Sequence, residues 1–447
     1  MMSPARRLHL NTSLLIPGHY RSAWRLPGHD PRGVFKIEHY VKTARLAEVG
    51  ELDAVFIGDS PALSPDVARD PQTSFDPLIL LSALAGVTSH IGLLGTASTT
   101  YNSPYNLARR FLSLDHVSGG RAGWNAVTSI APFAAGNFGL DEPPGLEERY
   151  ARAEEFIEVV KLLWASWGAG AVVGDQAEGV FVDLAKVPPI AHEGPYFRVQ
   201  GALTLPPSPQ GRPLVVVSGG SSQGLALAAR HADLVFTPQQ ELAAARKFRS
   251  RLVTQAYAAS RDVAPLVSPG LIVVLGSTLG EAQARREELD NTIELHDALE
   301  RLATGLGVDS GELRLDQPLP SSLLRAPLEG AASQGFVRAI LAVNDLEQLS
   351  VRDVILQFAG GPGHGKVVGT PEMVANHIEG WYRAEACDGF TLLPGDVAVD
   401  TELFVDHVVP ILRRRNLYHH AYEFDTLRER YGLSADPNHF SQLKELA

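Results

Sequence analysis

The chain has 447 residues, of which 45% are hydrophobic and 20% are charged, and its formal net charge at pH 7 is -12. This composition is typical of a globular protein with a large core and excludes an extensively disordered chain. Lys and Arg are interspersed with acidic residues and form no basic stripe, so nucleic acid is not an expected partner.

The sequence carries no signal for a membrane or a metal. No run of about eighteen apolar residues occurs, and the first residues lack the apolar stretch of a secretory signal, so we expect a soluble cytoplasmic protein with no membrane partner. HExxH, paired cysteines and EF-hand patterns are absent, and His19, His29 and His39 fall in different predicted elements. No metal site is therefore predicted.

Short apolar runs recur along the chain, each followed by a turn and a helical pattern. This alternation predicts an α/β fold of parallel strands covered by helices, and eight strands favour a closed (β/α)8 TIM barrel over an open sheet. The predicted strands are residues 8–15, 52–58, 91–97, 122–128, 213–219, 233–237, 271–277 and 389–393.

Polar side chains follow four consecutive strands. In a barrel the C-terminal strand ends meet at one face, where ligands bind. Each of these residues alone is also common at helix caps and turns, so no single one indicates a ligand site. The succession of four polar strand ends does. The residues are Asp59 and Ser60 at the end of the second strand, Ser98, Thr99 and Thr100 at the end of the third, Asn125, Thr128 and Ser129 at the end of the fourth, and Ser221 and Ser222 at the end of the fifth.

Two outer helices are predicted from their periodicity. Residues 149–167 place Tyr150 and other apolar residues on one stripe and acidic residues on the other. Residues 370–386 begin with Thr370 as a helix N-cap and Pro371 at the first helical position.

Two intervals are longer than the connections of a minimal barrel. Residues 168–212 are rich in Gly and Pro, and residues 278–370 have helical ends and a loop-like middle. We expect both to be rim insertions on a single barrel domain that spans residues 1–447. The second is a candidate lid over the active site.

The segment GGSSQG, residues 219–224, allows two interpretations. A strand, two glycines, two serines and a helix place N–H groups and hydroxyls where a phosphate monoester binds well. The segment also matches the GxSxG nucleophile elbow, in which Ser222 attacks an acyl carbon and His364, His377 or His407 serves as base. A serine hydrolase, or a ligand-binding barrel without turnover, therefore stays open. A Walker A loop and a Rossmann-type GxGxxG are absent.

Several long stretches resemble the bacterial-luciferase-like flavin monooxygenases, most closely the group of nitrilotriacetate, dibenzothiophene-sulfone and pristinamycin-synthase oxygenases. The similarity is dense over residues 8–240 and returns near residue 367. The stretches that carry it include NTSLLIPGHYRSAWRLPG, GLLGTASTTYNSPYNLARRFLSLDHVSGGRAGWNAVTS and VVGTPEMVANHIEGWYRAEACDGFTLLP.

The resemblance implies a (β/α)8 barrel that acts as the oxygenase of a two-component system. Such an enzyme takes reduced FMN, a diffusible cosubstrate, from a separate NAD(P)H:FMN reductase. With O2 it oxygenates a small organic substrate through a flavin C4a-hydroperoxide, and it forms a homodimer or homotetramer. Because the flavin supplies the oxygen chemistry, no catalytic acid or base is assigned.

The resemblance also implies contacts for the cofactor and the substrate. Flavin contacts match Asp59, Thr99, Asn125, Thr128 and Ser129, and contacts around the ribityl phosphate match Tyr150, Ser221 and Ser222. Trp24, Arg25 and Tyr101 are expected on the substrate side of the flavin, where Arg25 would pair with an anionic substrate.

The chain departs from the family pattern at three places, one of which is SGGSS at residues 218–222, where AGSS is more usual. Many relatives carry a histidine four residues before the tyrosine that matches Tyr150, and this chain has Leu146 there. One polar contact to the cofactor is therefore expected to be missing. Residues 280–365 match poorly, so neither the substrate nor the atom that receives oxygen is predicted.

Overall fold

Eight parallel strands form a closed barrel in the computed structural model, which describes residues 6–69, 71, 75–129, 132–320, 340, 348–361 and 363–434. The ring runs β1, β2, β3, β4, β9, β10, β11, β13 and returns to β1. All eight predicted strands are confirmed. Their bounds are β1 His9–Ser13, β2 Ala54–Ile57, β3 Gly92–Ser98, β4 Ala122–Val127, β9 Leu214–Ser218, β10 Leu234–Thr237, β11 Leu266–Leu275 and β13 Gly389–Pro394.

Alternation along β4 separates the core from the barrel interior. Trp124 is fully buried in the outer layer, where its ring lies 5.7 Å from that of Phe156 on α4 (Leu146–Trp164). Successive side chains of a strand point to opposite faces, so Asn125 points into the barrel. Trp124 therefore packs between the barrel and the helices, and Asn125 contributes to the polar interior of the barrel.

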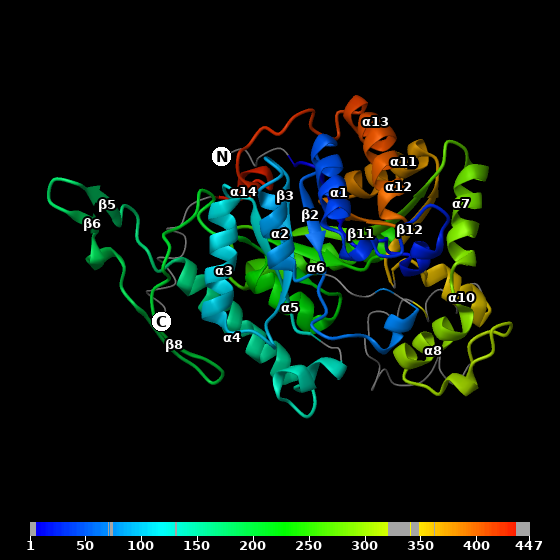
Figure 1. Ribbon diagram of the computed structural model, residues 1–447, viewed down its shortest axis with the longest axis horizontal. Coiled ribbons are helices and arrows are strands. Elements are labelled where there is room, and N and C mark those ends of the chain that lie inside the picture. Colours follow the sequence, from blue (N-terminus) through cyan, green and yellow to red (C-terminus); the bar gives the residue numbers. More distant parts are fainter. Residues whose placement is uncertain are drawn as a thin grey trace.

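Helices surround the barrel (Figure 1). Both predicted outer helices are confirmed, with shifted ends: α4 begins at Leu146, and α11 follows Thr370, whose Oγ1 accepts a hydrogen bond from the N–H of Met373. Besides α4, the helices of this layer are α1 Ile37–Val49, α2 Pro77–Ala85, α3 Pro104–Val117, α5 Ser222–His231, α6 Leu242–Ala258, α11 Pro371–Arg383, α12 Val397–Leu403 and α13 Val409–Arg414.

The first insertion forms two β-hairpins. β5 (Val172–Asp175) pairs with β6 (Val180–Val182), and β7 (Ile190–Glu193) pairs with β8 (Arg198–Gly201). The β5–β6 hairpin projects away from the barrel at the left of Figure 1.

The second insertion contributes helices and one further strand. α7 (Leu279–Asn291), α8 (Leu295–Leu306) and α10 (Val351–Phe358) lie at the right of Figure 1. β12 (Gly365–Gly369) pairs with the second half of β11. The sequence did not predict β12, because it is short, bounded by glycines and only half-buried. Residues 321–339, 341–347 and 362, also part of the candidate lid, lie outside the described residues.

The chain's last described segment closes the N-terminal end of the barrel. Leu427 of α14 (Leu427–Arg430) and Tyr431 pack against buried strand residues that include Leu94 and Leu214. Tyr431 also donates a hydrogen bond to Asn11 Oδ1 at 2.6 Å. The opposite end, where the strands stop, remains open for a site. Among the described helices, none is long and apolar enough to cross a membrane.

Candidate active site

Asn125 links three strands inside the barrel. Its Nδ2 donates to Thr96 Oγ1 at 2.9 Å, and its Oδ1 accepts from Ser218 Oγ at 2.7 Å. These hydrogen bonds fix the orientation of the Asn125 amide. They leave one N–H and one oxygen lone pair unused, so the amide can also bind a ligand. The structure thus places Asn125 in a polar layer beneath the open end.

The ends of β3 and β4 are tied together by hydroxyl groups. Ser129 Oγ donates to Ser98 Oγ at 2.7 Å, and Thr99 Oγ1 donates to the carbonyl of Val127 at 3.1 Å. Thr99 is fully buried, whereas Thr128 and Ser129 are half-buried. Ser129 has a φ of 31°, a conformation that a non-glycine residue adopts at a cost, and such strain occurs at functional sites.

Asp59 stands just beyond β2, beside open space. A Cβ added to the neighbouring Gly58 would meet no atom within 4 Å. The residue as a whole is exposed, yet partial burial of the carboxylate, and secondarily the charge of Asp76, raise the pKa of Asp59 to about 6. Asp59 is therefore available to a ligand in a mixture of protonation states near neutral pH.

The segment between β9 and α5 gathers hydroxyl and N–H groups at the start of a helix, where an anion could bind, and we call it the anion cradle. Ser221 is the N-cap of α5: its Oγ accepts from the N–H of Gly224 at 3.0 Å and lies 3.2 Å from the hydroxyl of Tyr150. Ser222 and Gln223 begin the helix, so their N–H groups have no partner within it. A Cβ on Gly219 would meet only open space. These residues fit the phosphate of FMN.

Leu146 begins α4 one turn before Tyr150, and it is 40% exposed. Residues four apart share one face of a helix, so Leu146 lies on the side that carries the Tyr150 hydroxyl. The position that is often histidine in relatives is thus an exposed apolar side chain beside the anion cradle.

The hydrolase alternative gains no support from the geometry. Ser222 Oγ donates to Gln223 Oε1 at 2.9 Å. His364 instead stacks on Phe236, and His377 stacks on Trp381. Among the described residues, no histidine hydrogen bonds to Ser222.

A cavity of about 560 Å³ lies beside the strand ends, between the loop after β1 and the second insertion. Trp24 and Arg25, in the 3-10 turn η1 (Arg21–Arg25), both line it. Trp24 Nε1 donates to the carbonyl of Arg69 at 3.1 Å. Tyr101 is not among the described lining residues; its ring stacks on Phe138 with centroids 4.4 Å apart. The structure brings together only two of the three predicted substrate contacts.

His19 also lines this cavity, and no sequence pattern singled it out beyond its spacing from other histidines. Its Nε2 is buried and has no hydrogen-bond partner among the described residues. Burial, and secondarily the charge of His364, lower the pKa of His19 to about 3, so the ring is neutral at pH 7. A neutral imidazole can donate or accept one hydrogen bond toward a ligand.

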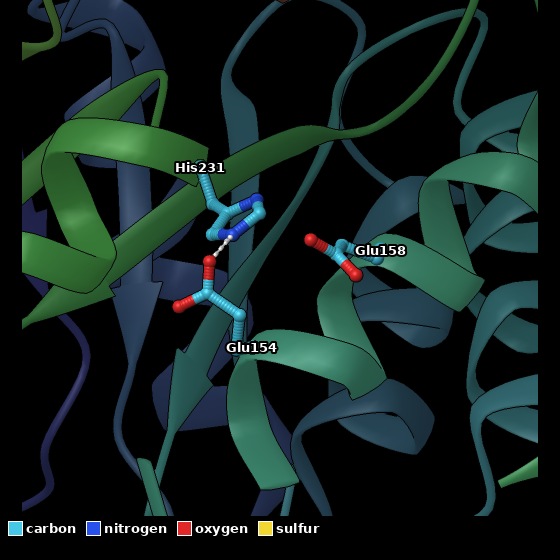
Figure 2. A group of neighbouring side chains, drawn as sticks. All are labelled: Glu154, Glu158 and His231. Atoms are coloured by element: carbon cyan, nitrogen blue, oxygen red, sulfur yellow. Dashed lines mark hydrogen bonds and ion pairs between the residues drawn. The ribbon is translucent and has the colours of Figure 1, made fainter. Parts of the chain in front are cut away.

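A cluster of Glu154, Glu158 and His231 lies between α4 and α5 (Figure 2), with ligating atoms within 4.8 Å of one another. His231 Nε2 lies 2.7 Å from Glu154 Oε1, and Arg230 forms an ion pair with the same carboxylate. Burial alone would raise the pKa of Glu154, but the hydrogen bonds from His231 and Arg230 outweigh this effect and lower the pKa to about 2. We interpret the cluster as an ion-pair network of the helical layer, and the absence of a metal site stays a prediction.

Comparison with known proteins agrees with this architecture. Residues 18–387 match the family model described as luciferase-like monooxygenase. N-acetyl-S-(2-succino)cysteine monooxygenase of Bacillus subtilis (strain 168) is 38% identical over 99% of this chain and 100% of its own length. Nitrilotriacetate monooxygenase component A of Aminobacter aminovorans is 39% identical over 98% of this chain and 99% of its own.

A solved structure is similar over nearly the whole chain. DmoA from Hyphomicrobium sulfonivorans superposes with a TM-score of 0.85 at 31% identity, covering 95% of this chain and 92% of that one. The predicted fold class and the stated resemblance are both confirmed. The chain belongs to the luciferase-like monooxygenase family, and it is an oxygen-using, flavin-dependent oxidoreductase.

Proposed function

We propose that the chain is the oxygenase of a two-component system, which takes reduced FMN from a separate NAD(P)H:FMN reductase and uses O2 to oxygenate a small organic molecule. The observation that carries this proposal is the anion cradle formed by Ser221, Tyr150 and the start of α5. The cradle lies at the end of a barrel whose interior presents Asn125 and Ser218. The anion cradle therefore suits a phosphate, and the adjacent barrel interior suits a planar polar ring.

In this proposal the phosphate of FMN binds at Tyr150, Ser221 and Ser222. The ring and ribityl chain lie over Asp59, Asn125, Thr128 and Ser129, with Thr99 in the wall behind them. Trp24 and Arg25 face the substrate in the adjoining cavity. Tyr101, which lies outside the described lining of that cavity, is assigned to the substrate side by resemblance alone.

Oxygenation is proposed to proceed through a flavin C4a-hydroperoxide, and the protein's task is then to exclude water. Water and stray protons destroy such a species and release hydrogen peroxide. α8 and α10 of the second insertion form one wall of the cavity, which suits a lid. A homodimer or homotetramer stays a prediction.

The two-component assignment predicts that the purified chain does not consume NADH by itself. No nicotinamide-binding motif is present, so FMN plus NADH should leave NADH absorbance unchanged. Adding an unrelated NADH:FMN reductase should start both NADH and O2 consumption, since only reduced FMN passes between the proteins. The reductase without the chain is the control for free-flavin oxidation. Direct NADH oxidation by the chain alone would contradict the assignment.

A further inference from the structure

We propose that the substrate is a small carboxylated molecule with an apolar segment, bound in the cavity between η1, α8 and α10 through Arg25 and Arg301. The inference rests on the proposed function, because it names the substrate class of the same enzyme. Three features of the cavity support the inference: its charge, its hydrogen bonds and its apolar lining residues.

Positive charge is concentrated in this cavity although the chain as a whole has a net charge of -12. A cleft lined mainly by one sign of charge raises the local concentration of oppositely charged molecules. The cavity therefore favours anions on a protein surface that otherwise repels them. Its charged lining residues are Arg21, Arg25, Arg69 and Arg301 against Glu294 and Asp297.

Both acidic residues of the cavity are engaged by one arginine. Arg69 Nε lies 3.0 Å from Asp297 Oδ2, and Arg69 Nη1 lies 3.6 Å from Glu294 Oε2. Neither acid forms an ion pair with Arg25 or Arg301 within the described part of the chain. The charge of those two arginines is thus not balanced by the cavity's own carboxylates.

Arg25 and Arg301 retain hydrogen-bond donors for a ligand. Arg25 Nη1 donates to the carbonyl of Thr292 at 2.6 Å, which orients the guanidinium and leaves its other N–H groups available. Arg301 is half-buried on α8 and makes no hydrogen bond or ion pair with any residue that the structure describes. The planar fork of a guanidinium matches a carboxylate with two parallel hydrogen bonds.

Much of the remaining cavity lining is apolar. This apolar lining includes Ile293 and Leu302 and, on α10, Val354, Ile355 and Phe358. The volume of about 560 Å³ is within the range of small-molecule sites. A ligand that carries both carboxylates and an apolar segment would match both the arginines and the apolar residues of the lining.

The test is calorimetric titration of the flavin-free protein with methylthiosuccinate, a dicarboxylic thioether, and with its uncharged dimethyl ester. We expect the dicarboxylate to bind at least roughly tenfold more tightly than the ester, since charge-assisted hydrogen bonds to two arginines are lost with the ester. Arg25→Gln and Arg301→Gln should each weaken dicarboxylate binding by roughly tenfold to a hundredfold and leave ester binding within about twofold.

Two further variants control for folding and for charge. Arg352→Gln removes an arginine of α10 that lies outside the cavity lining and pairs with Asp316, so it should change neither titration. Arg301→Lys keeps the positive charge but lacks the planar guanidinium. Its loss of affinity for the dicarboxylate should be intermediate between that of the parent and that of Arg301→Gln. Equal or tighter binding of the ester, no detectable binding of either probe, or unchanged dicarboxylate binding in both Gln variants would overturn the inference. Because no flavin is present, these results are independent of whether the enzyme oxygenates.

Discussion

Asp233→Asn is expected to lower the free energy of unfolding by about 3 to 5 kcal/mol, because it removes the buried carboxylate that pairs with two buried arginines. Asp233 is fully buried and accepts two hydrogen bonds from Arg212, at 2.7 and 3.0 Å, and one from Arg428 at 3.0 Å. It also accepts from the N–H of Val215. Asp233 thereby joins the β9–β10 corner to α14, which closes the barrel.

The same network predicts a pH dependence of stability. Burial alone would raise the pKa of Asp233, but Arg212 and Arg428 outweigh it and hold the pKa well below its usual range. The stabilisation is therefore complete above the pKa of the unfolded chain, about 4, and is lost as the pH falls further. The free energy of unfolding can be measured with urea at pH 7 and near pH 3. It should fall less between these two pH values in Asp233→Asn than in the parent.

A surface ion pair provides the matched control. Asp316 pairs with Arg352 at 2.9 Å, but its side chain is 79% exposed. Asp316→Asn should therefore cost no more than about 1 kcal/mol. If Asp233→Asn cost as little as Asp316→Asn, the buried network would not hold the barrel closed as described.

Ser221→Ala combined with Ser222→Ala is expected to weaken binding of reduced FMN by about 1 to 3 kcal/mol, or roughly 5- to 150-fold in Kd. The double change removes two hydroxyl groups at the proposed phosphate site and the hydrogen bond that caps α5. Anaerobic titration followed by flavin fluorescence measures this change. Reduced riboflavin, which lacks the phosphate, should bind the parent and the variant about equally.

Loss of the helix cap could also act indirectly, so a second capped helix serves as the control. Thr370→Ala removes the side chain that caps α11 in the outer layer, without touching the proposed site. Its affinity for reduced FMN should match that of the parent. An unchanged Kd for FMN in the double variant, or an equal loss for riboflavin, would remove the phosphate assignment.

The sequence predicted the barrel because its strands are buried on both faces and therefore appear as continuous apolar runs. β12 escaped prediction for the opposite reason, since Gly365–Gly369 is half-buried and lies in an insertion. The polar strand ends were located correctly along the chain, and Asn125 and Ser221 do hydrogen bond to groups from other strands and helices.

The substrate side could be predicted only in part. Trp24 and Arg25 lie in the connection between β1 and α1, at the end of the barrel where the strands stop, and both line the cavity. Arg301 and Phe358 reach the same cavity from α8 and α10, which lie much further along the chain. Their approach depends on how α8 and α10 pack, and local sequence pattern does not contain that information. Tyr101 shows the converse: it follows a strand, yet it stacks on Phe138.

The most direct test of the proposed function is rapid mixing of the anaerobic complex of the chain and reduced FMN with oxygenated buffer. We predict a C4a-hydroperoxide absorbance that forms quickly and decays far more slowly than in free flavin, because binding in the proposed site would shield the flavin from water. Reoxidation of reduced FMN at the rate of free flavin, with no such intermediate, would contradict the proposed oxygenase mechanism.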